Sequence, residues 1–210
     1  MTVDAGNLWQ AAQTGILQPL DSVELATKVP ANLQDIDKQW YALTIRARTI
    51  VYSTDRVQPE QLSTYEALAE PQWRGRLCLR TSKKVYNQSL VATMIAAQGE
   101  SVTEAIVSGW VANLAMPPLS NDTKVMEAIT SGQCDVSIVN TYYFGRLQNQ
   151  QPDLKLALYW PNQQGAAAAG RGVHVNVSGA GVTKASKNKA QAQKLLEWLV
   201  SSEAQQQLMS

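Results

Sequence analysis

Histidine, cysteine and unbalanced charge are all scarce in this chain of 210 residues, and each scarcity excludes a class of function. His174 is the single histidine, which excludes a histidine-rich metal site and most histidine-dependent catalysis. Two cysteines are too few for a disulfide scaffold and form no zinc pattern. The formal net charge is +1, with no basic tract or acidic tail, so binding to nucleic acid or to a membrane surface through bulk charge has no support.

Long hydrophobic runs are also lacking. No stretch approaches the roughly 18 to 20 apolar residues of a membrane span. The first ten residues, MTVDAGNLWQ, have neither the basic region nor the apolar region of a signal peptide. The composition itself, with 45% hydrophobic and 17% charged residues, is that of a globular protein. The length is sufficient for one large domain or two smaller lobes with a real core.

Strand and helix patterns alternate along the sequence. Residues 40–54, WYALTIRARTIVYST, are rich in β-branched and aromatic side chains and favour one long strand. Helical spacing predicts helices over 87–99 and 120–133, and a C-terminal helix over 188–209 that breaks near Ser201. This alternation predicts an α/β fold with a mainly parallel sheet.

The order of the strands predicts two lobes. Strand-like regions at 41–53 and 154–178 bracket a middle segment that has βαβ units of its own. This pattern is typical of two lobes joined by two crossing strands. We therefore predict an outer lobe made of 1–51 with 158–210 and an inner lobe made of 52–157.

Two adjacent tyrosines stand where an apolar strand gives way to a helix, in CDVSIVNTYYFGR at 134–146. Neighbouring residues on a strand point to opposite faces, so only one of Tyr142 and Tyr143 could be buried beneath a sheet. Where the chain changes direction, however, both phenols can reach one cation. Fe(III) prefers oxygen donors and makes a phenol ionise far below its usual pKa of about 10. The alternative is one ring in the core and the other on the surface.

A third tyrosine follows the same layout. Cys78 lies eight positions before Tyr86, and Cys134 lies eight positions before Tyr142. Each tyrosine follows a short strand and a polar loop, and parallel strands would bring both loops to the carboxyl edge where open α/β sheets bind ligands. The two cysteines could pair if their strands are close, which fits an oxidising compartment, or they could be small buried hydrophobic residues.

Three further features of the sequence carry weaker signals. Arg46 and Arg48 lie two apart on the long strand and hence on one face, so a carboxylate or a bound anion is expected nearby; the alternative is a surface face with salt bridges. The stretches GAAAAGRG and SGAGV lack the pattern of a phosphate loop and are interpreted as loop and turn. His174 alternates with Val173 and Val175 and is interpreted as a strand residue, not a ligand.

Specific motifs occur in order along nearly the whole chain, among them TVDAGNLW, LTIRARTIVY, VYNQSLVATMIA and CDVSIVNTYYFGRL. Together they resemble the bacterial periplasmic ferric-ion-binding proteins, which are the substrate-binding components of iron(III) ABC transporters. The resemblance implies a two-lobed, type II periplasmic binding-protein fold with an iron site in the cleft. It also implies a periplasmic location, no enzymatic activity and an inner-membrane ABC permease as partner.

The resemblance assigns roles to individual residues. It implies that Tyr142 and Tyr143 are both ligands of Fe(III) and that Tyr86 is a further ligand. It places Arg46 facing the site, often through a synergistic anion such as carbonate, and Arg146 just outside the ligands. Three phenolates balance Fe(III), so an added carbonate would leave negative charge that an arginine stabilises.

Both ends of the chain depart from the family pattern. Relatives carry a signal peptide and a strand–helix segment before TVDAGNLW, and that segment supplies one more ligand. Their C-terminal helices also continue further. The resemblance therefore implies a member truncated at both ends, with the N-terminal element missing and more coordination positions left to water, an anion or a neighbouring chain. Removing the first strand of a parallel sheet would expose backbone and apolar surface, which predicts self-association.

Two other functions fit the same fold. One is a binding protein for a small anion, held by arginines and by helix N-termini such as that at Asn121. The three tyrosines argue against it, because anion sites do not need acidic phenols. The other is the ligand-sensing domain of a transcription regulator, which would need an N-terminal helix-turn-helix that the sequence does not show. No nucleophile–base pair or pair of carboxylates in the sequence indicates an enzyme.

Overall fold

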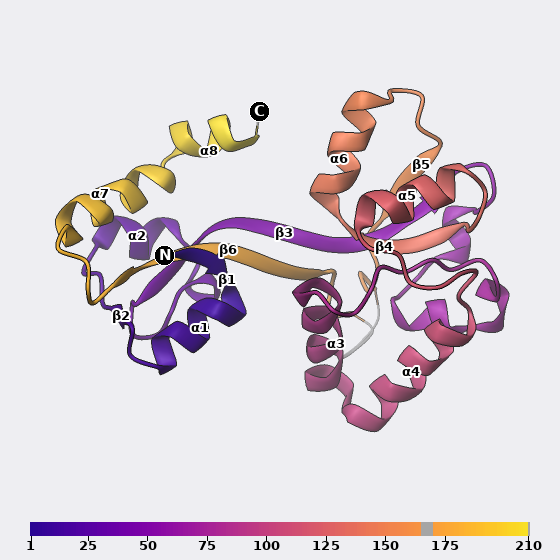
Figure 1. The fold of residues 1–210 in the computed structure, drawn as a ribbon, viewed down its shortest axis with the longest axis horizontal. Coiled ribbons are helices and arrows are strands. Elements are labelled where there is room, and N and C mark those ends of the chain that lie inside the picture. The colour runs from indigo at the N-terminus through magenta and orange to yellow at the C-terminus, as the bar shows by residue number, and fades with distance from the viewer. Residues whose placement is uncertain (165–169, 210) are drawn as a thin grey trace. The chain divides into compact units, whose positions relative to one another are not determined.

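The structure, a computed structural model, describes residues 1–164 and 170–209 (Figure 1). Most of the glycine- and alanine-rich loop predicted from GAAAAGRG lies outside the described residues. The chain forms two compact units, Met1–Arg46 with Asn176–Ser210 and Ala47–Val175. None of the described helices is both long and apolar enough to cross a membrane.

The two units share two long strands. β3 (Trp40–Ser53) begins in the first unit and ends in the second, and β6 (His174–Thr183) returns. The prediction of one long strand over 40–54 is therefore confirmed. β3 is continuous because its β-branched and aromatic residues suit a pleated, largely buried surface.

The first unit surrounds the outer half of these two strands (Figure 1). Its other elements are β1 (Thr2–Asp4), α1 (Ala5–Gln13), β2 (Leu17–Gln18), α2 (Val23–Lys28), α7 (Lys189–Leu199) and α8 (Ser202–Met209), with a 3-10 turn at 31–33. β1 and β2 both pair antiparallel with β6. A Cβ on Gly179 of β6 would lie 2.5 Å from the carbonyl oxygen of Tyr41, so glycine is required at that close approach. The predicted helix break near Ser201 separates α7 from α8 and is confirmed.

The second unit has helices on both faces of its sheet (Figure 1). Its elements are α3 (Val85–Gln98), α4 (Glu100–Ala112), α5 (Asp122–Thr130), β4 (Val136–Asn140), α6 (Thr141–Gln150) and β5 (Leu156–Tyr159), with 3-10 turns at 59–61, 66–69 and 71–73. Successive residues of β3 face opposite layers: Ile50 packs with Leu90 of α3 in one cluster, and Val51 packs with Met126 of α5 in the other. Both faces are covered, as the α/β prediction required.

The predicted direction of the sheet is wrong for the paired strands. β3 pairs antiparallel with both β4 and β5. Isolated parallel bridges join Leu77 with Leu114 and Val136, and Arg80 with Leu119. The reason is that β3 arrives from the other unit and lies between β4 and β5, opposite in direction to both. Alternation of helices and strands along the sequence does not reveal where such a crossing strand inserts.

The observed boundaries also correct the predicted lobes. The first boundary follows Arg46, close to its predicted place, but the second follows Val175 and not residue 157. The chain beyond β5 stays with the second unit because of polar contacts. The Nδ2 atom of Asn162 donates to the Glu66 carboxylate at 2.9 Å, and Asn162 is fully buried. The hydrophobic pattern of the sequence does not report such a contact.

A disulfide lies within the second unit. Cys78 and Cys134, whose pairing the sequence left open, are joined with their Cα atoms 5.9 Å apart. Both belong to the cluster that α5 and α6 cover, and neither is appreciably exposed. The bond ties the segment before α3 to the start of β4, which are the two segments that lead to the tyrosines.

Candidate metal centre

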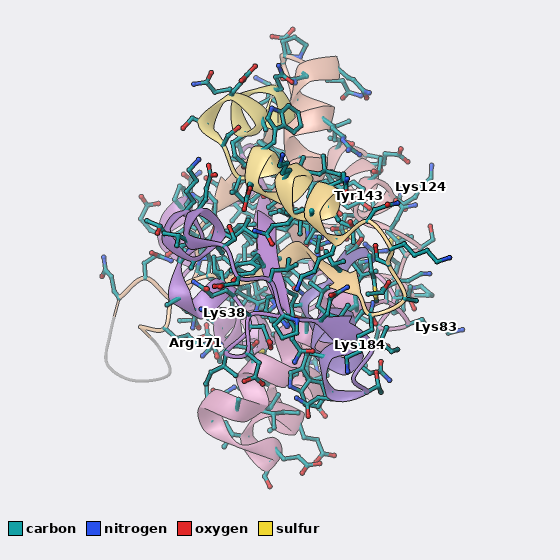
Figure 2. The ribbon with its side chains drawn as sticks, turned by 90° about the vertical axis from the view of Figure 1, so that its left-hand side faces the viewer. Lys38, Lys83, Lys124, Tyr143, Arg171 and Lys184 are labelled. Atoms are coloured by element: carbon teal, nitrogen blue, oxygen red, sulfur yellow. A yellow bond between two sulfur atoms is a disulfide. The ribbon has the colours of Figure 1, made fainter. Side chains whose placement is uncertain are left out.

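The three tyrosines predicted as ligands come together in the second unit. Tyr86 lies in the first turn of α3, and Tyr142 and Tyr143 lie in the first turn of α6. The hydroxyl oxygens of Tyr142 and Tyr86 are 3.5 Å apart. The ring centroids of Tyr142 and Tyr143, the latter labelled in Figure 2, are 4.4 Å apart. All three side chains are half-buried, so they form one partly accessible group of phenols.

Local parallel pairing explains why the tyrosines meet. The backbone N–H of Cys78 donates to the carbonyl of Val136 at 3.0 Å, and Leu77 forms a parallel bridge with the same residue. The segment before α3 and strand β4 therefore run in one direction and end at one edge, where each is followed by a helix. The expectation that both tyrosine-bearing loops reach one edge, drawn from the equal cysteine–tyrosine spacing, is confirmed at this pair of segments.

The Tyr142 phenol favours its neutral form when no cation is present. Burial raises the pKa of the Tyr142 hydroxyl, and its hydrogen bond to Tyr86 raises it further. A hard cation reverses this preference, because it stabilises the ionised phenolate directly. Among the described residues, no three His, Cys, Asp or Glu side chains gather so that they could hold a metal ion. The hydroxyl oxygens of Tyr86 and Tyr142, 3.5 Å apart, are oxygen donors of the kind that a hard cation prefers.

Two arginines lie against the tyrosine rings. The guanidinium carbon of Arg146 is 5.5 Å from the centre of the Tyr142 ring, and that of Arg80 is 4.7 Å from the centre of the Tyr86 ring. Arg146 was named from the resemblance, whereas Arg80 was missed by the sequence analysis. An arginine over an aromatic face is favourable for the neutral ring and more so for a phenolate.

Arg46 has partners in the first unit. Its Nη2 atom forms an ion pair with the carboxylate of Asp4 and donates to the carbonyl of Val177 at 2.9 Å. The carboxylate that the sequence analysis expected beside an arginine on this strand is therefore present. A role for Arg46 beside the tyrosines, which belong to the second unit, stays a prediction from the resemblance.

Arg48, two residues further along β3, is buried, whereas one of the two alternatives drawn from the sequence placed it on the surface. Its side chain is only 2% exposed, so the alternative of a surface face with salt bridges is wrong for it. Arg48 donates from Nη1 to Asp122 at 3.2 Å and to Asn140 at 3.0 Å, and from Nη2 to Asn87 at 2.6 Å. Asn87 directly follows Tyr86 in the sequence, and Asn140 lies two residues before Tyr142. A buried cation thus holds both tyrosine-bearing segments.

His174 is the first residue of β6, which confirms its interpretation as a strand residue. Its Nε2 is 2.8 Å from the hydroxyl of Ser89, and its Nδ1 is 3.1 Å from that of Thr93. Thr93 donates its own proton to the Ser89 carbonyl, so its oxygen accepts from Nδ1–H and Ser89 donates to Nε2. Burial lowers the pKa of His174 to about 4, with nearby arginines lowering it further.

We expect this neutral histidine to make the fold acid-sensitive. Between its ordinary pKa of 6.5 and its native pKa of about 4, the unfolded chain binds the proton that the native chain does not. The contribution is therefore fully present above pH 6.5 and is lost as the pH falls toward 4, with a total on the order of 3 kcal/mol. The free energy of unfolding, measured with urea at a series of pH values, should depend less on pH between 6.5 and 4 in His174→Gln. An unchanged pH dependence would contradict the neutral state assigned to His174.

The fold and the cluster of phenols define the class of this protein. The family model of bacterial extracellular solute-binding proteins matches residues 1–210, and the chain belongs to this family. Iron uptake proteins A2 and A1 of Synechocystis are 48% and 46% identical to it over 97% and 98% of the chain. The chain spans 60% and 57% of the length of these two relatives.

A solved structure gives the same assignment. The Trichodesmium protein determined in complex with iron and citrate is 45% identical in sequence and superposes with a TM-score of 0.89. The match covers 97% of this chain and 65% of that one. The chain is therefore similar, over nearly all of its own length, to a part of proteins that are named for iron uptake or solved with iron.

Proposed function

We propose that this protein binds ferric iron through Tyr86, Tyr142 and Tyr143 and delivers it to an ABC-type iron(III) importer. The observation that carries the proposal is the 3.5 Å separation of the Tyr86 and Tyr142 hydroxyl oxygens, with the Tyr143 ring against that of Tyr142. Two phenol oxygens at this distance can coordinate one cation together. Three phenolates match the charge of Fe(III), and the iron-uptake names of the relatives agree with this cargo.

An anion bound together with the iron is part of the proposal. Fe(III) with three phenolates is neutral, and further coordination positions suit carbonate or a carboxylate such as citrate, which the Trichodesmium structure contains. The complex would then be negative. Arg146 and Arg80 lie over two of the tyrosine rings and would offset that charge, and we assign the same role to Arg46.

We infer that the protein acts in the periplasm as a carrier and not as an enzyme. The buried disulfide between Cys78 and Cys134 suits an oxidising compartment, and the family consists of extracellular binding proteins. In such a carrier the chemistry is exchange of ligands around the cargo, and the partner is the membrane permease that accepts it. Self-association remains a prediction; several apolar side chains of the first unit are exposed, including Trp9, Val23 and Ile36.

Titration with ferric citrate tests the metal site directly. Phenolate bound to Fe(III) should give a visible charge-transfer band that saturates with added iron. Tyr86→Phe, Tyr142→Phe and Tyr143→Phe should each weaken or shift the band and lower the affinity by about tenfold or more, because each removes one anionic donor. Tyr159→Phe, in β5 of the same unit, is the matched control and should behave as the unmodified chain.

The outcomes separate clearly. A band that all three site variants alter and the control leaves unchanged supports the proposed ligands. A band that survives in one site variant with unchanged position and affinity removes that tyrosine from the ligand set. The absence of any band at millimolar iron would contradict ferric-iron binding by this chain.

A further inference from the structure

Three buried charged residues lie behind the tyrosines: Arg48, Arg80 and Asp122. Asp122 is 0% exposed, Arg48 2% and Arg80 5%. One carboxylate serves two guanidinium groups, with Arg48 Nη1 at 3.2 Å from Oδ2 and Arg80 Nη1 at 3.1 Å from Oδ1. Among the ion pairs of the described residues, Asp122 is the only carboxylate that either arginine contacts. The Arg48–Asp122–Arg80 cluster therefore carries one formal positive charge in excess.

The sequence places each member of this cluster on a different element. Arg48 comes from β3 and Arg80 from the segment before α3. Asp122 opens α5, because the side chain of Asn121 caps that helix by accepting from the N–H of Lys124 at 2.9 Å. Asp122 also accepts from the backbone N–H of Asn140 at 2.9 Å, at the end of β4. The cluster thus joins the strands and helices that converge on the tyrosines.

The member of the cluster that lies next to Tyr86 is Arg80. The Nε atom of Arg80 is buried and has no hydrogen-bond partner among the described residues, although a buried guanidinium normally uses its donors. The same guanidinium lies over the Tyr86 ring, 4.7 Å from its centre. An uncompensated buried cation is costly unless a negative group is close. A metal-bound phenolate at Tyr86 is such a group.

Arg48 acts on the geometry of the site. It donates to the Oδ1 atoms of both Asn87 and Asn140. Asn87 is adjacent to Tyr86 in the sequence, and the Nδ2 atom of Asn140 is 3.4 Å from the hydroxyl oxygen of Tyr142. One buried side chain therefore bridges the two segments whose hydroxyl groups must converge on one cation.

We propose that the Arg48–Asp122–Arg80 cluster is the positioning and charge-compensating base of the tyrosine site, with Arg80 offsetting the charge of a metal-bound Tyr86 phenolate. This inference rests on the proposed ferric-iron function. Arg80 attracts the neutral ring only through its quadrupole, and it attracts the phenolate through full charge. It therefore favours the metal-bound state over the metal-free state. If an anion joins iron and three phenolates, the excess positive charge of the cluster offsets the negative charge of that complex.

Two substitutions at Arg80 distinguish the effect of its charge on iron binding from the effect of its packing. Arg80→Gln removes the charge, and we expect ferric affinity in competition with citrate to fall by about tenfold or more, with a shift of the charge-transfer band. Arg80→Lys keeps the charge and should recover the affinity to within about threefold. Arg76→Gln is the matched control, since Arg76 also stacks on an aromatic ring, at 5.1 Å from Trp73, and pairs with Asp135 at 2.6 Å. It should leave both affinity and band unchanged.

A double-mutant cycle with Tyr86→Phe tests whether Arg80 changes the ferric affinity through Tyr86. If Arg80 acts through the phenolate of Tyr86, the change in affinity caused by Arg80→Gln should largely disappear when position 86 carries no phenol. Should Arg80→Gln fail to fold, as judged by circular dichroism, the same cycle is run with Arg80→Lys, and its loss of affinity, expected to be about threefold or less, must vanish in the Tyr86→Phe background.

Each result is decisive for one claim. Absence of a band in the unmodified chain contradicts the proposed function itself. A normal band in the unmodified chain, together with wild-type affinity and spectrum in Arg80→Gln, overturns the role of the cluster and leaves iron binding intact. Equal losses in Arg80→Gln and Arg80→Lys, or an effect that persists undiminished without Tyr86, also overturn it.

Discussion

Asp122→Ala is expected to destabilise the second unit by about 3 to 5 kcal/mol, because it leaves two buried guanidinium groups without their carboxylate. The cost is larger than that of removing a hydrogen bond, since Arg48 and Arg80 cannot reach water to recover solvation. The backbone N–H of Asn140 also loses its acceptor. Urea unfolding followed by circular dichroism measures the loss as a lower transition midpoint.

Asp135→Ala is the matched control for this prediction. Asp135 also pairs with two arginines, Arg56 at 2.5 Å and Arg76 at 2.6 Å, but those partners are 36% and 28% exposed. Solvent screens the exposed pairs and rehydrates the arginines once the carboxylate is gone, so we expect a loss of only about 1 kcal/mol. Equal losses at both positions would contradict the claim that Asp122 compensates a buried excess of positive charge.

Opening the disulfide is expected to cost about 4 kcal/mol of unfolding free energy. Cys78 and Cys134 are 56 residues apart in the sequence, and a cross-link over a loop of this length removes much of the conformational freedom of the unfolded chain. The bond also joins the two segments that precede the tyrosines. We therefore expect lower ferric affinity in the reduced protein as well.

Two measurements check this expectation. Urea unfolding with and without a thiol reductant should show the stability difference, and a Cys78→Ala, Cys134→Ala variant should match the reduced protein and no longer respond to reductant. A response to reductant in that variant would point to a different cause. If the reduced protein were as stable as the oxidised one, the disulfide would contribute nothing to the native fold.

Local sequence patterns determined much of the scaffold around the candidate site. The β-branched and aromatic run of β3 depends on residues close together in the chain, so the residue pattern predicts this strand. The positions of the tyrosines also follow from local features of the sequence. Tyr142 and Tyr143 follow an apolar strand directly, and the equal spacing from Cys78 and Cys134 indicated where Tyr86 would lie. Features of this kind depend on residues close together in the chain and can therefore be predicted from the sequence.

Tertiary structure alone decided the sheet directions, the second unit boundary and the electrostatics behind the tyrosines. Asp122 lies 74 residues from Arg48 in the sequence and 42 from Arg80, and each of the three looks unremarkable in its own segment. Burial and partner choice are properties of the packed whole, because a charge becomes costly only when neighbours from distant segments exclude water from it. The sequence by itself therefore indicated the phenols, and only the folded chain showed which buried cations lie beside them.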